Sequence, residues 1–256
     1  MINSSFLLYL DYKEKYIMMK YTKENPLRVF TTFSGYDSQC LALKKAGIPF
    51  DLIGWSEIEK RAIMAHDAIF PEYKDRNYGD ICKIDWTQIP DFDLFTYSSP
   101  CQSFSIAGQR LGGEEGSGTK SSLLWECKKA IEIKKPKYLM LENVKMLVSN
   151  NFIHTFNKWV DFLNSLGYIS NWKVLNGRDY GIPQDRSRVF LVSIMNPEID
   201  FVFPMGTKVT TSIEDYMFTK KELGEELYNK LCVNKEIVDN YVKYNKHFLK
   251  FAVKQK

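Results

Sequence analysis

The feature that most constrains the fold is a regular alternation of apolar strand segments with helical segments between residues 27 and 195. Strands alternating with helices of about 10 to 15 residues form a mostly parallel sheet with helices on both faces. The expected strands are 27–33, 51–55, 92–97, 138–141, 169–174 and 189–194, and the expected helices are 37–46, 57–69, 122–134 and 152–166. We therefore predict an α/β, Rossmann-like domain.

Composition excludes several classes of protein. The chain has 256 residues, enough for one domain with a small appendage, and no apolar run of about 18 residues that would cross a membrane. Its five cysteines are an odd number without a Cys-x-x-Cys pair, which argues against a disulfide framework and a metal site and favours a reducing cytoplasm. The net charge of +4 permits nucleic-acid binding without demonstrating it.

The two ends of the chain differ from its middle. Residues 1–26 have no clear period, and Met18 or Met19 is an alternative start, so we expect an N-terminal extension. Residues 27–196 are expected to form the main domain. In residues 197–256 the periodicity weakens, and residues 207–256 look helical and lysine-rich, with no acidic residue after Asp239. That tail is suited to phosphates, although a solvated charged surface is the more ordinary interpretation.

Cys101 follows the apolar segment 92–97 directly after Pro100. Ligands of open α/β sheets bind beyond the carboxyl ends of the strands, so the thiol is expected in that crevice. A single cysteine is, on its own, more often a small buried hydrophobe. Glu142 follows the segment 138–141 at the same expected edge, and alternation places Arg186 and Arg188 on one face. The arginines alone are equally consistent with ordinary ion pairs.

A second group of residues follows the first two expected strands. The turn Phe33-Ser34-Gly35 precedes a helix N-terminus, and Gly35 permits close approach of a ligand. Glu57 is placed where such folds bind ribose hydroxyls, although a carboxylate at a helix N-terminus is the plain alternative. Asp80 is equally consistent with a turn cap and with an acceptor for an adenine amine.

Four segments in one order resemble the blocks of the DNA cytosine-5 methyltransferases: Phe33-Ser34-Gly35, Ser99-Pro100-Cys101-Gln102, Glu142-Asn143-Val144 and Gln184-Asp185-Arg186-Ser187-Arg188. The run from Leu175 to Gln184 resembles that family too. The match covers about residues 28–195. It implies a class I S-adenosylmethionine-dependent methyltransferase fold, with S-adenosylmethionine as cofactor and double-stranded DNA as partner.

The resemblance implies a role for each matching residue. Cys101 would be the nucleophile that adds to carbon 6 of cytosine, Glu142 would donate to ring nitrogen 3, and Arg186 and Arg188 would hold the base. The cofactor pocket would comprise Phe33, Ser34, Gly35, Glu57, Ile58, Asp80, Ile81, Ser99 and Pro100. The segment 103–120 resembles the mobile loop that closes over a flipped base, and the DNA contacts would be Gln102, Ser103, Arg110 and Lys120.

The chain departs from the family pattern at two places. Tyr36-Asp37-Ser38 stands where many members have glycines, which makes the helix entrance bulkier and more acidic. Beyond Arg188 only 68 residues remain, and they contain no Gly-Asn block, so the target-recognition region is expected to be partial.

The shortened end leaves two functions open. The leading hypothesis is a bacterial or phage-encoded DNA cytosine-5 methyltransferase used in DNA modification. The alternative is a catalytically incomplete DNA- or cofactor-binding subunit, which a second chain would complete with the missing blocks. A cysteine hydrolase requires a histidine base, and His66, His154 and His247 all lie in expected helices.

Overall fold

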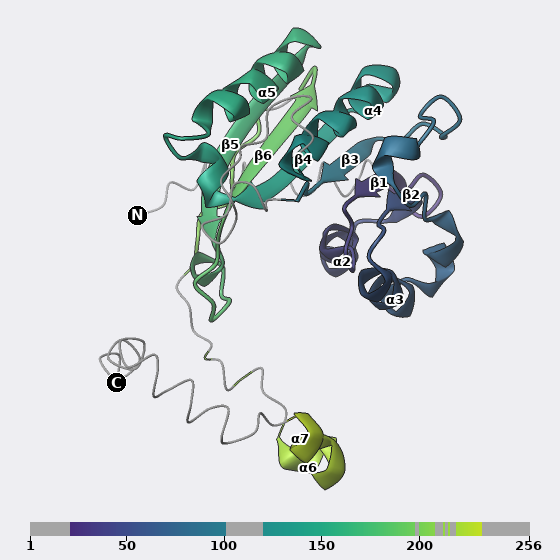
Figure 1. Cartoon of the computed structure of the whole chain (residues 1–256), viewed down its shortest axis with the longest axis vertical. Helices are drawn as coiled ribbons and strands as arrows, with labels where there is room; N and C mark the ends of the chain where they lie inside the picture. Colours follow the sequence, from purple (N-terminus) through teal and green to yellow (C-terminus); the bar gives the residue numbers. More distant parts are fainter. Residues whose placement is uncertain are drawn as a thin grey trace.

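The computed structural model describes residues 21–100, 120–197, 200–207, 212, 215 and 219–231, and its centre is a six-stranded sheet (Figure 1). The strand order is β2-β1-β3-β4-β6-β5. The first four strands pair in parallel, whereas β6 is antiparallel to both of its neighbours. The bounds are β1 (Leu27–Thr32), β2 (Phe50–Ser56), β3 (Leu94–Tyr97), β4 (Tyr138–Val144), β5 (Tyr168–Asn176) and β6 (Ser187–Met195). The predicted mostly parallel sheet is therefore confirmed.

Helices cover both faces of this sheet (Figure 1). One face carries α4 (Cys127–Lys134) and α5 (Ile153–Ser165), and the other carries α2 (Ser38–Lys45) and α3 (Lys60–Ile69). Short 3-10 helices connect the layers. They are η1 (Pro71–Arg76), η2 (Ile81–Lys83), η3 (Lys120–Glu126), η4 (Lys145–Val148) and η5 (Gly177–Asp179).

The central strands are buried on both faces, as their unbroken apolar sequence predicts. In β1, Phe30 packs in the cluster that contains Ile131 of α4 and Trp159 of α5. The adjacent Val29 packs in the opposite cluster, with Cys40 of α2. Successive strand residues point to opposite faces, so a strand between two helical layers needs apolar side chains at both.

Several element boundaries differ from those predicted. Strand β4 continues to Val144 because it pairs with β6 as far as Arg188, so Glu142 and Asn143 lie within the strand instead of following it. Helix α3 begins at Lys60, because the Glu59 side chain caps it by accepting from the backbone N–H of Ala62. The expected helix 122–134 is a 3-10 helix up to Glu126 and α-helical only from Cys127.

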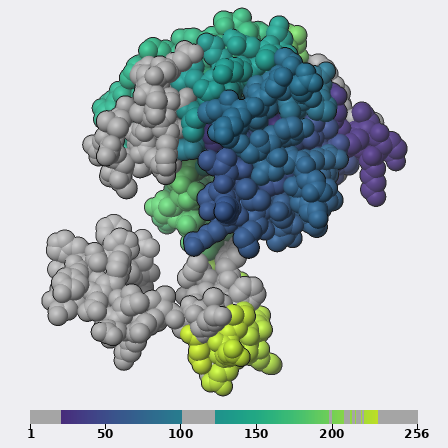
Figure 2. Space-filling view, turned by 45° about the vertical axis from the view of Figure 1, so that its right-hand side comes forward, coloured from purple at the N-terminus to yellow at the C-terminus, as the bar shows by residue number. Residues whose placement is uncertain are grey.

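The described part of the C-terminal tail is tied to the segment before β6. Tyr180 Oη donates to the carbonyl of Pro204, and Thr207 forms a parallel bridge with Tyr180. Two short helices, α6 (Lys220–Leu223) and α7 (Glu225–Leu231), lie apart from the sheet (Figure 2). Within the described ranges, no helix is long and apolar enough to cross a membrane.

Candidate active site

A carboxylate and an arginine meet near the carboxyl end of β4. Glu142 lies two residues before the end of β4, and Arg188 lies one residue inside β6. The register pairs Val144 with Arg188, which puts Arg188 diagonally across from Glu142 on the same face. Arg188 Nε lies 3.0 Å from Glu142 Oε1, and both side chains are about three-quarters buried, with exposures of 22% and 24%. The antiparallel register of β4 and β6 therefore brings Arg188 to Glu142, a contact that the sequence alone did not indicate.

Burial dominates the electrostatics of this pair. It raises the pKa of Glu142 above its ordinary value of 4.5, although Arg188, Arg186 and the Ser98 hydroxyl each favour the charged form. Desolvation penalises the carboxylate more than its partners stabilise it. The site therefore holds a carboxyl group that is unusually ready to be protonated.

The segment between β3 and the candidate nucleophile is attached to β4. Asn143 is 3% exposed, and its amide donates to the carbonyl of Ser99 at 3.2 Å and to Ser99 Oγ at 3.4 Å. Tyr97 pairs with Leu141, so the chain after β3 runs beside Glu142. Ser99 and Pro100 are thus fixed against the strand that carries the carboxyl group.

Other predicted site residues cannot be placed. Cys101, Gln102, Ser103 and Arg110 lie outside the described residues. Lys120 is the first residue of η3, but its side chain lies outside the description as well. Their roles remain predictions from the sequence.

Asn176 organises the approach to the two arginines. Its amide donates to Asp185 Oδ1 at 2.6 Å and to Ser187 Oγ at 3.2 Å, and its carbonyl oxygen accepts from the backbone N–H of Arg186 at 3.3 Å. The end of β5 is thereby joined to the start of β6. This contact fixes the backbone at Arg186, whose charge also acts on Glu142.

The turn after β1 has an unusual backbone. Phe33, Gly35 and Asp37 all have positive φ values, of 53°, 57° and 62°. A Cβ placed at Gly35 would meet no atom within 4 Å, so space is open beside it. Asp37 is fully buried and holds the turn together, because its carboxylate accepts from Thr31 Oγ1 at 2.8 Å and from the backbone N–H of Cys40 at 3.1 Å. The residue that departs from the family pattern is thus the N-cap of α2.

Glu57 links this turn to the end of β2. One of its oxygens accepts from the backbone N–H of Gly35 at 3.0 Å, and the other accepts from Ile58 and Glu59 at 2.8 and 2.9 Å. A carboxylate offers about four acceptor positions, so about one remains for a ligand. The alternative interpretation was a carboxylate that accepts from backbone amides at a helix N-terminus. This interpretation accounts for part of the role of Glu57.

Asn77 joins the backbone of Glu57 to that of Gly79 in the next segment, and nothing in the local sequence indicated this role. Its side chain accepts from the backbone N–H groups of Glu57 and Gly79 and donates to the carbonyl of Glu57. Asp80, which follows, caps η2 by accepting from the backbone N–H of Cys82 at 3.1 Å. The turn-cap interpretation of Asp80 is therefore confirmed, and its second oxygen lies 3.9 Å from Lys83 Nζ.

Close packing fixes these segments beside the turn after β1. A Cβ at Gly54 in β2 would lie 2.5 Å from the Tyr78 ring and 2.6 Å from the Phe30 ring, so only glycine fits there. Ile81 is 5% exposed and belongs to the core, whereas Ile58 is 70% exposed beside Glu57. Of these two predicted cofactor contacts, Ile58 is the one that presents an apolar side chain to solvent.

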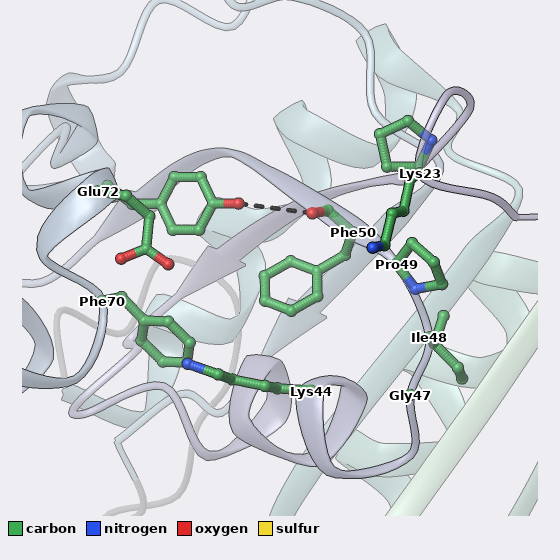
Figure 3. A pocket seen from close by; sticks show the side chains of 10 residues that line it. Lys23, Lys44, Gly47, Ile48, Pro49, Phe50, Phe70 and Glu72 are labelled. Atoms are coloured by element: carbon green, nitrogen blue, oxygen red, sulfur yellow. Dashed lines mark hydrogen bonds between the residues drawn. The ribbon is translucent and has the colours of Figure 1, made fainter.

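A pocket of about 420 Å³ lies at the opposite edge of the sheet (Figure 3). Phe50 at the start of β2 lines it, together with Lys44, Phe70 and Tyr73, and the Tyr73 hydroxyl donates to the carbonyl of Phe50. None of the sequence-predicted site residues lines this pocket. The pocket is therefore separate from the carboxyl edge, where Glu142, Gly35 and Glu57 lie.

The strand order and the antiparallel β6, with a glycine-containing turn after β1 and an acid after β2, define a class I S-adenosylmethionine-dependent methyltransferase fold. Solved structures show the same fold. A methyltransferase of Entamoeba histolytica, EhMeth, matches with a TM-score of 0.61 at 21% identity, over 76% of this chain and 60% of that one. A putative DNA modification methyltransferase from an Escherichia coli prophage matches with a TM-score of 0.58 at 22% identity, over 74% and 53%.

The chain belongs to the C-5 cytosine-specific DNA methylase family, whose model matches residues 27–254. It is 41% identical to the type II methyltransferase M2.ScrFI of Lactococcus lactis subsp. cremoris, over 84% of this chain and 74% of that protein. It is 36% identical to the orphan methyltransferase M.SssI of Spiroplasma monobiae, over 70% of this chain and 44% of the relative. The chain thus spans about three-quarters of the first relative but less than half of the second. These matches give no support to a separate completing subunit.

Proposed function

We propose that the protein transfers a methyl group from S-adenosylmethionine to carbon 5 of cytosine in double-stranded DNA. The observation that supports this most directly is the Glu142–Arg188 pair, which places a carboxyl group of raised pKa beside the segment that leads to Cys101. Family membership supports the same reaction. The odd cysteine count without a Cys-x-x-Cys pair supports a reducing, cytoplasmic setting.

The proposed reaction begins with covalent catalysis. The Cys101 thiolate adds to carbon 6 of cytosine while Glu142 donates a proton or hydrogen bond to nitrogen 3, which makes carbon 5 nucleophilic. Carbon 5 takes the methyl group, then loses its proton to a base, and the carbon–sulfur bond breaks to restore the thiolate. A buried carboxyl group of raised pKa suits the donor role, because it retains its proton more readily and a carboxylate has no proton to give.

The arginines act on the same base. Arg188 presents a guanidinium beside Glu142, and Arg186 adds a second positive charge close enough to influence that carboxyl group. Such forks orient carboxylates and base oxygens through directional hydrogen bonds. We propose that the two arginines hold the base and Glu142 in a fixed orientation relative to each other.

The residues around Gly35 fit the proposed cofactor. S-adenosylmethionine, when bound, supplies an electrophilic methyl group. The open space beside Gly35 and the single remaining acceptor position of Glu57 suit a ligand with a ribose hydroxyl. Exposed Ile58 supplies an apolar surface next to that position. Phe33, Ser34, Asp80, Ile81, Ser99 and Pro100 are proposed to complete the cofactor side.

The proposed DNA contacts are Gln102, Ser103, Arg110 and Lys120, in a loop that would close over a flipped cytosine. Residues 27–196 would form the catalytic domain. Residues 1–26 would be an extension, and residues 197–256 would be a partial target-recognition region. The DNA target sequence would be read by base-edge contacts from that last region.

The experiment that tests this function measures transfer of a labelled methyl group from S-adenosylmethionine to mixed-sequence duplex DNA. The purified chain is compared with Cys101→Ser and with Cys82→Ser, a matched change at an exposed cysteine. Label on carbon 5 of cytosine with the natural chain and Cys82→Ser, but not with Cys101→Ser, is expected. Equal labelling by Cys101→Ser would disprove the nucleophile. No labelling by a folded natural chain would favour an incomplete binding protein.

A further inference from the structure

A chain of polar contacts connects the turn after β1 with Glu142. Gln39 lies in the first turn of α2, and its amide Nε2 donates to Ser98 Oγ at 3.1 Å. Ser98 directly follows β3, whose last residue Tyr97 pairs with Leu141, so Ser98 lies beside Glu142, and its hydroxyl favours the charged form of that carboxyl group. The segment after β1 and the region around Glu142 thus meet at the Ser98 hydroxyl.

The contacts of Gln39 are compatible with one direction of proton donation. A serine hydroxyl has one proton, so an oxygen that accepts from Gln39 remains free to donate that proton to Glu142. Ser38 Oγ donates to Gln39 Oε1 at 3.1 Å, which is consistent with an amide that presents Nε2 to Ser98. An amide whose oxygen accepts at one end presents its N–H groups at the other.

Gln39 and Ser98 are both partly buried, where a hydrogen bond is stronger than in water. The backbone beside Ser98 is fixed as well, because Asn143 holds Ser99. The position of Gln39 in turn depends on Asp37, the buried N-cap one residue before α2. The contact therefore joins two rigid segments and not two mobile side chains.

We propose that Gln39 is a positioning residue of the methyltransferase site, which orients the Ser98 hydroxyl toward Glu142 and so fixes that carboxyl group against the base. The inference deepens the proposed function and rests on it for its kinetic part. It adds a residue from the cofactor half of the site to the group that controls the base half. Loss of the Gln39 amide would free the Ser98 hydroxyl to rotate away from the carboxylate.

The test compares Gln39→Met, Ser98→Ala and the double variant with the natural full-length chain. Methionine is an unbranched side chain of similar length that lacks the donor. Gln88→Met is the matched control, since the Gln88 side chain is exposed and its amide donates to the neighbouring Thr87 Oγ1. Circular dichroism first confirms that every variant is folded.

The decisive readout is a carbon-13 NMR titration of the Glu142 carboxyl group, assigned with Glu142→Gln. Loss of a hydrogen bond to the charged form raises a carboxyl pKa. Gln39→Met and Ser98→Ala are each expected to shift the midpoint upward, and the double variant no further than Ser98→Ala. A merely structural role of Gln39 would leave this midpoint unchanged.

Kinetics supply the second readout. Gln39→Met is expected to lower kcat by about tenfold, with little change in KM for S-adenosylmethionine, because misplacement of a reacting group affects the chemical step. A Glu142 midpoint unchanged by Gln39→Met, or shifts that add in the double variant, would overturn the proposal. A natural chain without methyl transfer would refute the proposed function alone, since the NMR titration needs no activity.

Discussion

Arg188 Nε contacts Glu142 Oε1 at 3.0 Å, yet the pKa of Glu142 is raised and not lowered. An arginine at this distance would ordinarily depress a carboxyl pKa. The raised value shows that the loss of solvent around Glu142 outweighs the positive charges of Arg188 and Arg186. The two arginines limit the effect of burial on the pKa of Glu142 without reversing it.

The first prediction concerns the pH dependence of catalysis. Only protonated Glu142 can donate to the base, so kcat/KM should fall as the pH rises through the raised pKa of Glu142. Glu142→Gln should remove this dependence and lower kcat by about 10²- to 10⁴-fold. Initial rates measured across the pH range check both points. An unchanged pH profile in Glu142→Gln would contradict the donor role.

The same raised pKa has a consequence for stability. The folded state binds the Glu142 proton more tightly than the unfolded state, so its contribution to stability is complete below the ordinary value of 4.5 and is lost as the pH rises through the folded pKa. Glu142→Gln imitates the neutral group. Relative to the natural chain, its free energy of unfolding in urea should therefore be more favourable at pH 7 than at pH 4. A difference independent of pH would refute this linkage.

Arg188→Lys tests the geometry of the guanidinium. Lysine keeps the charge but cannot present the same planar fork, so a directional bond to Glu142 is lost. We expect kcat/KM to fall by about tenfold to a hundredfold, as the loss of a charge-assisted hydrogen bond implies. Arg76→Lys is the control, because Arg76 pairs with Asp51 in an exposed contact away from the site. Similar small losses in both variants would show that charge alone matters at position 188.

Glu57→Gln should weaken cofactor binding. The carboxylate accepts from three backbone N–H groups, and a glutamine amide would turn one NH₂ group toward those donors. Calorimetric titration with S-adenosylmethionine should show affinity reduced by about tenfold to a hundredfold. Glu72→Gln, at the pocket on the opposite edge, should bind as the natural chain does. Unchanged affinity in Glu57→Gln would remove Glu57 from the cofactor site.

Asp37→Ala should destabilise the fold. It removes the N-cap of α2 and leaves Thr31 Oγ1 without its buried acceptor. Together these losses should lower the free energy of unfolding by about 2 to 4 kcal/mol. Asp37→Asn, which can still cap and tolerates positive φ, should lose less. Urea unfolding of the two variants measures the difference, and equal losses would contradict the capping role.

Much of the fold could be predicted from the sequence, because strands buried on two faces have continuous apolar sequences. Strand alternation predicted that Arg186 and Arg188 share a face, whereas the approach of Arg188 to Glu142 depends on the antiparallel register of β4 and β6, which the local sequence does not specify. Asp37 was treated as a departure from the family pattern, because its contacts with Thr31 and Cys40 appear only after the turn has folded. Gln39 and Ser98 are 59 residues apart, and nothing in the local sequence of either indicates that they meet.

The attachment of residues 204–207 to Tyr180 bears on where the chain after β6 can be exchanged between relatives. The polypeptide leaves β6, returns past the segment that supports Arg186, and only then continues toward α6. A hybrid protein joined to a relative at Pro197 would lose residues 204–207, which contact Tyr180 in the segment before Arg186. A junction placed after Thr207 would keep this contact and exchange only the residues that follow Thr207.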